Sequence, residues 1–318
     1  MLTIILLLAA CCVAFTNGAN ANFKGVASLY GSGTTSLRGA LYWGTATTFA
    51  GSVAAAFLAE GMLLKFSGKG IVPDSLVQSQ EFMSAVAIGA ALTSFLATRF
   101  GFPVSTTHAL VGALAGAGLA GSGADVSFQA LGTSFLVPLF FSPVVAGILG
   151  AVVYLLLKGL RLAPDHRTRA LDVMHYLSAG AASFARGLND TPKIAALLLV
   201  APGLDNRWGF ILVAVTIAAG GLLDADRVAE TLGKKVTDMN PGQGFAACLV
   251  TASLVTAASF RSMPMSTTHV SVGSLLGMGV TTGQAKWRKV GEILLAWIST
   301  VPCGAILAAI TYVIISLF

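Results

Sequence analysis

Long apolar segments alternate with short polar ones along the whole chain. A hydrocarbon core of about 30 Å takes roughly 20 helical residues to cross. The segments are continuously apolar rather than alternating in short units, which predicts membrane helices and not a β-barrel. We therefore expect an all-α polytopic membrane protein of about ten spans. Segments of spanning or near-spanning length lie at 1–16, 41–64, 82–98, 106–122, 132–157, 170–185, 208–223, 243–260, 267–282 and 291–317.

The composition agrees with a protein that resides in lipid. Hydrophobic residues make up 55 % of the chain and charged residues 10 %, and the mean hydropathy is +0.82. Soluble domains carry about a quarter charged residues. The net charge is +6, but the basic residues are scattered singly between apolar segments, so we expect no nucleic-acid partner. The four cysteines show no metal-ligand spacing, and we expect no cofactor.

Two motifs occur twice along the chain. Pro-Val-Ser-Thr-Thr-His at 103–108 returns as Pro-Met-Ser-Thr-Thr-His at 264–269, and Phe15–Lys24 aligns with Phe184–Lys193, 169 residues later. In the second pair Gly, Asn and Lys recur at identical spacing. This self-similarity predicts a duplicated protein with repeats at 1–160 and 161–318. Because five spans per half is an odd number, the second copy must enter the membrane in the opposite sense, which makes the repeat inverted.

The distribution of basic residues predicts an orientation. With the N-terminus outside, thirteen Lys and Arg residues fall in inside loops and six in outside loops. We therefore expect both termini outside the cell or plasma membrane and the midpoint loop, 158–169, in the cytoplasm. The inside residues are Lys24, Arg38, Arg99, Lys158, Arg161, Arg167, Arg169, Arg227, Lys234, Lys235, Lys286, Arg288 and Lys289; the outside residues are Lys65, Lys69, Arg186, Lys193, Arg207 and Arg261.

The Ser-Thr-Thr-His motif predicts a helix that starts inside the membrane. Proline suits the first turn of a helix and serine or threonine suits its cap. The free N–H groups of such a start, with three adjacent hydroxyls, form an anion site, and inverted symmetry would bring two starts together near the midplane. Alternatively, the hydroxyls bond back to their own helix. The occurrence of two copies at matched positions, each followed by a Gly-rich helix, favours binding.

The Gly-x-Asn motif suggests a cation site. Asp190, beside Asn189, is the only carboxylate in the two copies. Carboxylate, amide and unwound backbone oxygens suit Na⁺, and an Asp can also carry a proton. The alternative is that Asp190 caps a helix beginning at Thr191–Pro192. His108 and His269 are either proton carriers or partners of a neighbouring helix, and Lys24 and Lys193 either attract an anion or extend toward the membrane surface.

At these residues the sequence resembles the inorganic phosphate transporter family, cation-coupled carriers that include sulfate permeases. The family's duplicated Gly-Ala-Asn-Asp motif is matched by Gly18–Asn20 and Gly187–Asp190. The resemblance implies an inverted-repeat carrier with broken or re-entrant helices, often a homodimer, that moves phosphate with Na⁺ or H⁺. It further implies oxyanion ligands at Ser105, Thr106, Thr107, Ser266, Thr267 and Thr268, and a coupling site, for Na⁺ if that is the ion, at Asn20, Asn189 and Asp190.

The sequence departs from the family pattern at one position, and two other functions, a sulfate permease and an enzyme, were considered. Ala21 stands where the family usually has the first aspartate, which removes a candidate cation ligand and puts coupling in question. An H⁺-coupled sulfate permease is the alternative function, since hydroxyl and N–H donors suit either oxyanion. A buried carboxylate acceptor favours phosphate, which alone keeps a proton to donate near neutral pH. No nucleophile-base-acid arrangement is evident, so we expect no enzyme.

Overall fold

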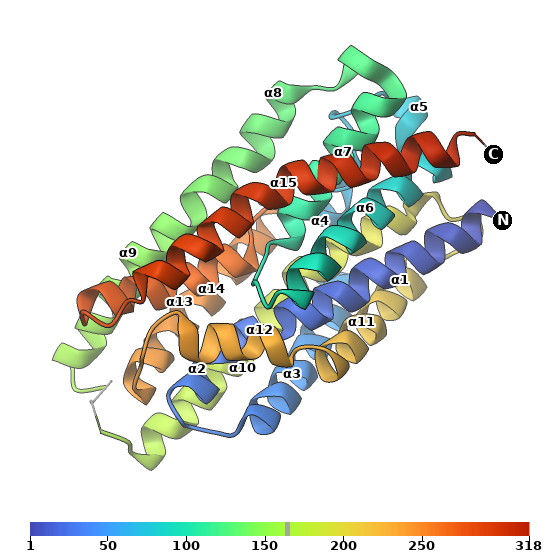
Figure 1. The fold of residues 1–318 in the computed structure, drawn as a ribbon. Coiled ribbons are helices and arrows are strands. Elements are labelled where there is room, and N and C mark those ends of the chain that lie inside the picture. Colours follow the sequence, from blue (N-terminus) through green and yellow to red (C-terminus); the bar gives the residue numbers. More distant parts are fainter. Residues whose placement is uncertain (163–165, 318) are drawn as a thin grey trace.

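The fold is a bundle of long helices that lie roughly side by side (Figure 1). The structure is a computed structural model that describes residues 1–162 and 166–317, apart from the side chains of Glu60 and Ala124. Every predicted apolar segment corresponds to one long helix, and the described residues form no strand, so the expected all-α class is confirmed. The long helices are α1 (Leu2–Ala21), α3 (Leu37–Leu58), α6 (Gln80–Arg99), α7 (Thr106–Ser122), α9 (Val137–Gly159), α10 (Arg169–Ala195), α11 (Asn206–Leu223), α13 (Pro241–Phe260), α14 (Thr267–Thr281) and α15 (Trp287–Ile315).

Short helical pieces connect the long helices. The α-helical ones are α2 (Ala27–Gly31), α4 (Glu60–Lys65), α5 (Asp74–Val77), α8 (Phe128–Leu131) and α12 (Asp226–Glu230). The 3₁₀ segments are η1 (Asn22–Gly25), η2 (Gly123–Asp125) and η4 (Ala196–Val200), and π-helical turns form η3 (Gly132–Leu136) and η5 (Thr231–Lys235). Two 3₁₀ segments, η1 and η4, directly follow α1 and α10, the helices that carry the Gly-x-Asn motif. The chain therefore changes its winding just after each motif.

Six helical segments of the described chain are long and apolar enough to cross a membrane by themselves. They confirm a multi-pass membrane protein, whereas the expected total of about ten spans stays a prediction. The helices α7 and α14 have only 17 and 15 residues, as expected for helices that begin part-way through the bilayer. The six segments are Leu2–Gly25, Gln80–Arg99, Phe128–Gly159, Asn206–Leu223, Pro241–Phe260 and Trp287–Ile315.

The two halves of the chain are interleaved. Within the halves, α1 packs on α6 and α10 on α13. Across them, α7 of the first half packs on α15 of the second, and α14 of the second half packs on α9 of the first. Similarly, α3 packs on α10 and α11 on α1. Each contact between halves thus has a counterpart with the roles of the halves exchanged.

Glycines make two of these crossings close. A Cβ on Gly18 would overlap the carbonyl oxygen of Ile217 in α11, and a Cβ on Gly187 would overlap that of Thr48 in α3. Thr48 and Ile217 are separated by the same 169 residues as Gly18 and Gly187. Small residues at a membrane helix crossing let the backbones approach, so the motif glycines are explained by packing.

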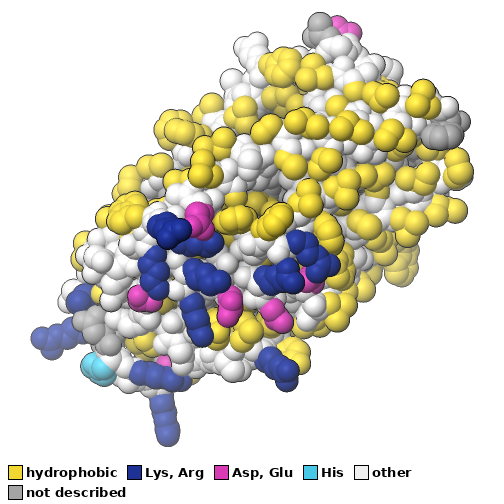
Figure 2. Space-filling view, in the orientation of Figure 1, with side chains coloured by type: hydrophobic (Ala, Val, Ile, Leu, Met, Phe, Trp, Pro, Cys, Tyr) yellow, Lys and Arg dark blue, Asp and Glu magenta, His cyan; other side chains and the backbone are white. Residues whose placement is uncertain are grey.

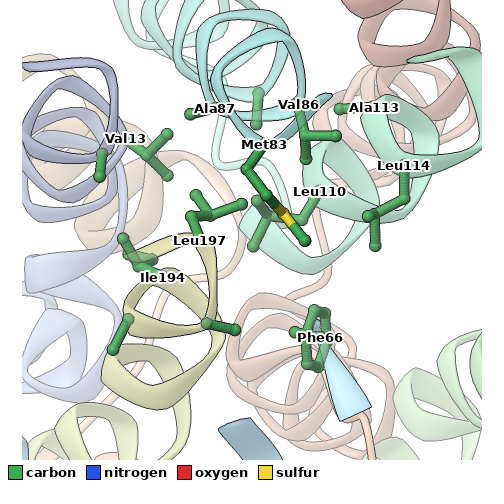
Figure 3. Close-up of a cluster of buried hydrophobic side chains, with 14 of the residues drawn as sticks. Val13, Phe66, Met83, Val86, Ala87, Leu110, Ala113, Leu114, Ile194 and Leu197 are labelled. Atoms are coloured by element: carbon green, nitrogen blue, oxygen red, sulfur yellow. The ribbon is translucent and has the colours of Figure 1, made fainter. Parts of the chain in front are cut away.

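The apolar core also joins the halves. Figure 3 shows Val13 of α1, Met83 of α6 and Leu110 of α7 close to Ile194 of α10 and Leu197 of η4. All five side chains are buried. Close packing of this kind, and not exclusion of water, holds membrane helices together.

The surface is apolar over most of the visible face (Figure 2). Large hydrophobic side chains are exposed there and elsewhere, among them Phe57, Phe140 and Ile298. Lys and Arg side chains gather over the part of the molecule where α2 and α12 lie, whereas both termini lie toward the other end (Figures 1 and 2). This arrangement fits a lipid-facing belt with a basic cytoplasmic end, and the orientation itself stays a prediction.

Candidate functional site

The two Ser-Thr-Thr-His motifs form equivalent helix starts. Ser105 caps α7 by accepting a hydrogen bond from the backbone N–H of His108, and Ser266 caps α14 by accepting one from His269, each at 3.2 Å. The predicted caps are therefore confirmed. The prolines were wrongly placed in the first turn, because Pro103 precedes the cap in non-helical backbone, as does its counterpart in the second motif. The first N–H groups of each helix have no intrahelical partner and face the start of the helix.

A left-handed residue ends the helix before each motif. Gly101 has φ +70°, and Ser262, at the equivalent position, has φ +51°. The next backbone N–H reaches back to close the turn, from Phe102 to Ala97 O and from Met263 to Ala258 O, both at 2.9 Å. This capped break lets the chain stop one helix and start another inside the bundle.

The motif asparagines brace these breaks. Asn20 Nδ2 donates to Thr98 Oγ1 at 3.0 Å, and Asn20 Oδ1 accepts from Val104 N at 2.9 Å. Asn189 Nδ2 donates in the equivalent way to Ser259 Oγ at 2.9 Å. Asn189 Oδ1, by contrast, is buried and has no hydrogen-bond partner among the described residues. Asn20 thus holds the first break in place with both of its amide atoms, whereas Asn189 keeps one oxygen free.

Two lysines cross between the halves. Lys24 Nζ donates to Val104 O at 2.7 Å and to Thr268 Oγ1 of the second half. Lys193 Nζ donates to Met265 O at 2.8 Å and to Thr107 Oγ1 of the first half at 2.9 Å. Both side chains are buried, so the alternative in which they extend toward the membrane surface is wrong. Each lysine therefore joins a threonine of one helix start to the carbonyl just before the other.

Asp190 lies at the centre of this arrangement. Its Oδ1 accepts from Lys193 Nζ at 3.0 Å. Its Oδ2 accepts from Thr267 Oγ1 at 3.2 Å and from Asn17 Nδ2 at 3.3 Å, and lies 3.7 Å from Arg186 Nε. Asp190 lies inside α10, which also contains Pro192, so the interpretation as a helix cap is wrong. The carboxylate instead contacts Thr267 of the second helix start directly and lies beside two cations, Arg186 and Lys193. Lys193 in turn links it to Thr107 of the first helix start.

Arg186 was not anticipated as a site residue. Its guanidinium donates to Asn17 Oδ1 and, at 3.2 Å, to Asn17 O, and Asn17 Nδ2 donates in turn to Thr106 Oγ1 at 2.9 Å. Arg186 and Asn17 occupy equivalent positions of the two Gly-x-Asn motifs, directly before the glycine. An arginine directly before the motif glycine, at the position of Asn17 in the first half, is the signal that sequence analysis overlooked. Burial also changes the count of basic residues on the two sides of the membrane. Lys24 of the inside set and Arg186 and Lys193 of the outside set are buried, which leaves twelve inside residues against four outside residues.

No hydrogen bond among the described residues joins Asp190 to either of the two asparagines expected to share a coupling cation with it, and the coupling site stays a prediction. Both amide atoms of Asn20 already form hydrogen bonds, to Thr98 and to the loop before α7. Of these three residues, only Asn189 has a side-chain oxygen, Oδ1, without a hydrogen-bond partner among the described residues. The donors around Asp190 are ammonium, guanidinium, amide and hydroxyl groups, which fit an anion-binding centre better than a Na⁺ cage.

The two motif histidines meet each other. Their rings contact edge to face with centroids 4.6 Å apart, and the His269 ring lies on Trp297 at 4.0 Å. His269 Nδ1 hydrogen-bonds to Leu139 O of α9 at 2.9 Å, which supports the expectation of a partner on a neighbouring helix. The histidines thus connect the first turns of α7 and α14.

Helices broken inside a membrane bundle around a buried charged centre define a membrane transport protein. The comparisons with known proteins give its family. The model of the phosphate transporter family matches the chain twice, at residues 17–171 and 163–308, and the chain belongs to that family. Its homologues are transporters and not enzymes, as expected from the sequence.

Several relatives match over nearly the whole chain. A probable low-affinity inorganic phosphate transporter of Rhizobium meliloti (strain 1021) is 30 % identical over 94 % of this chain and 92 % of the relative. A protein of the same description from Bacillus subtilis (strain 168) is 26 % identical over 100 % of this chain and 98 % of the relative. A solved structure described as "The sodium-dependent phosphate transporter" superimposes with a TM-score of 0.88 at 21 % identity, over 100 % of this chain and 99 % of that one. That likeness shows the fold.

Proposed function

We propose that the protein moves inorganic phosphate across the membrane by secondary active transport. The observation that carries the proposal is the meeting of two equivalent helix starts at one buried centre with Lys24, Lys193 and Arg186. Unpaired backbone N–H groups, threonine hydroxyls and cationic side chains are the donors that a tetrahedral oxyanion requires. We assign the anion to Thr106, Thr107, Thr267 and Thr268, with Ser105 and Ser266 shaping the helix starts as caps.

An inverted repeat explains how such a site could open to either side. The matched hydrogen bonds of Asn20 and Asn189, of the two lysines and of the two serine caps support repeats at 1–160 and 161–318. If the halves are related by a two-fold axis in the membrane plane, a contact broken on one side has an equivalent on the other. Alternating access then consists of exchanging these two sets of contacts.

Phosphate is favoured over sulfate as the substrate. The relatives that match over most of the chain are described as phosphate transporters. The carboxylate of Asp190 adds no preference between the two oxyanions, because both of its oxygens already accept hydrogen bonds within the protein.

Uptake against a gradient needs a driving ion, and the family resemblance proposes Na⁺ or H⁺. Asn20, Asn189 and Asp190 are the proposed coupling residues, and of these Asn189 has a buried oxygen, Oδ1, without a hydrogen-bond partner among the described residues. The homodimer implied by the resemblance stays a prediction.

The test is uptake of radiolabelled phosphate into proteoliposomes that contain the purified full chain. An imposed Na⁺ gradient and an imposed pH gradient are applied separately, and unlabelled sulfate is added as competitor. Accumulation of phosphate that sulfate does not inhibit is expected. Accumulation of sulfate with no uptake of phosphate would contradict the assignment of substrate.

A further inference from the structure

The charges of the centre do not balance. Lys24, Arg186 and Lys193 are 4 %, 2 % and 1 % exposed, and Asp190, the acid that faces them, is 3 % exposed. Among the described residues, these three cations face this one carboxylate, which leaves two positive charges without an acidic partner. Removing a charge from water costs several kcal/mol unless it is paired, so a bound anion would stabilise these cations. A dianion, the form of hydrogenphosphate, would restore neutrality.

Lys193 is coordinated as a small cation would be. Its ammonium has three protons and three oxygen acceptors, Asp190 Oδ1 at 3.0 Å, Thr107 Oγ1 at 2.9 Å and Met265 O at 2.8 Å. A carboxylate, a hydroxyl and a carbonyl before a helix start are also the oxygen types that hold Na⁺ in broken-helix transporters. The chain's own ammonium therefore uses the oxygens that a mobile cation would need.

The second oxygen of the carboxylate is also occupied. Asp190 Oδ2 accepts from Thr267 and Asn17 and faces Arg186. A Na⁺ ion beside Asp190 would lie next to two fixed positive charges, each within 4 Å of the carboxylate. Like charges at such distances repel strongly where water is excluded.

The first half lacks the counterpart of this carboxylate. Lys24 corresponds to Lys193, but Ala21 stands where the second half has Asp190. Lys24 Nζ has two oxygen acceptors among the described residues, Val104 O and Thr268 Oγ1, and neither carries a charge. Its positive charge is thus free to pair with a bound anion.

We infer that Lys193 fills, from within the chain, the place of a coupling cation beside Asp190, and that Lys24 and Arg186 supply the charge for a phosphate dianion, so that phosphate exchange needs no Na⁺. This inference rests on the proposed phosphate transport and specifies the charge of its substrate site. Asn189 Oδ1 lies outside the Asp190 network and is an amide oxygen without a carboxylate, which makes it a weak Na⁺ ligand by itself.

The first experiment measures Na⁺ binding and phosphate exchange separately. Purified full chain in detergent is assayed for binding of radiolabelled Na⁺, and proteoliposomes loaded with unlabelled phosphate are assayed for exchange at fixed pH with choline in place of Na⁺. No saturable Na⁺ binding and an exchange rate within about twofold of the Na⁺ value are expected. Saturable Na⁺ binding that Asp190→Asn abolishes, or exchange that falls about tenfold in choline, would overturn the inference. If no phosphate exchanges in either salt, the proposed function fails. The Na⁺-binding result still tests whether Lys193 occupies the cation position beside Asp190.

The second experiment tests the role of Lys193 by a gain of binding. Lys193→Met removes the ammonium and frees three oxygens around Asp190. Saturable Na⁺ binding is expected to appear in this variant and to vanish again in the double variant Lys193→Met with Asp190→Asn. Size-exclusion chromatography establishes that each variant is folded. A folded Lys193→Met protein that binds no Na⁺ would show that the ammonium does not occupy a cation position, and if this variant does not fold, the wild-type binding measurement decides.

Discussion

Lys24 donates a hydrogen bond to Thr268 although 244 residues separate them in the chain. The equivalent lysine of the second half, Lys193, bonds to Thr107 of the first half. Each half thus supplies the cation that contacts the other half's helix start. This reciprocity makes the centre a property of both halves together, and it is the basis of the predictions that follow.

The threonines of the helix starts are expected to be essential for uptake. In Thr106→Val the acceptor of Asn17 Nδ2 is lost, and in Thr267→Val the hydroxyl that donates to Asp190 is lost. We expect phosphate uptake to fall at least about tenfold in each variant, because each loses one of the hydroxyl groups assigned to the anion. Thr311→Val is the control, since that hydroxyl bonds to its own helix at Leu307 O. Normal uptake in both site variants would remove these threonines from the anion site.

Removal of the buried carboxylate is expected to destabilise the protein. The structure places Asp190 between Arg186 and Lys193, so its carboxylate is the acidic partner of both cations. Breaking a buried charge cluster costs about 3–5 kcal/mol, whereas an exposed pair contributes at most about 1 kcal/mol. Thermal unfolding in detergent should therefore show a large loss for Asp190→Asn and a small one for Asp172→Asn, which affects the surface pair with Arg167. Equal losses would mean that the central cations do not depend on Asp190.

Added phosphate should change the stability of the folded protein in the same assay. A dianion that neutralises the centre binds the folded state alone and raises its unfolding temperature. We expect this increase in the wild type and a smaller one in Lys24→Met, which lacks the unpaired ammonium of the first half. If phosphate stabilises both proteins equally, Lys24 does not contact the anion.

The motif glycines are expected to tolerate no side chain. In Gly18→Ala and Gly187→Ala the new Cβ would overlap the carbonyl oxygens of Ile217 and Thr48, so the crossing helices must separate. Overpacking of this kind costs about 1–3 kcal/mol. Gly291→Ala in α15 is the control, because nothing lies within 4 Å of its Cβ position, and it should be neutral or stabilising by up to about 1 kcal/mol. Thermal unfolding of the three variants checks this order.

Ser262→Gly should stabilise the protein. Ser262 has φ +51°, in the left-handed region, which costs a residue with a Cβ roughly 1–2 kcal/mol. Glycine already occupies the equivalent position of the first half at Gly101, so Gly101→Ala should destabilise by a similar amount. Opposite shifts in unfolding temperature are expected, and a loss in both variants would show that the Ser262 side chain contributes a needed contact.

Much of the fold could be predicted from the sequence, because lipid leaves few alternatives to apolar helices. The serine caps were also predictable, since capping depends on residues within one turn. The arrangement of charges at the centre could not be predicted from the sequence. Arg186 and Lys193 were placed in outside loops because a basic residue near a helix end usually lies at the membrane surface. They are buried because residues far away in the chain contact them, Asn17 of α1 at Arg186 and Thr107 of α7 at Lys193.

The role of Asp190 could not be predicted from the sequence either. Its residue type suits a cation ligand, a proton carrier or a cap, and the sequence could not distinguish them. The distinction depends on what faces the carboxylate from positions far away in the chain, Asn17 from α1 and Thr267 from α14. Long-range partners of this kind carry no local pattern.

The interleaving of the halves has a consequence for the ancestry of the protein. If one gene was duplicated, the single half that came before it exposed the surfaces that α7 and α15, or α9 and α14, now cover. Such a half would have been stable only when paired with an identical molecule lying upside down beside it. The bond between Lys24 and Thr268 would then have joined two separate chains. In that case fusion would have let the two copies differ within one molecule, and Ala21 opposite Asp190 would be such a difference.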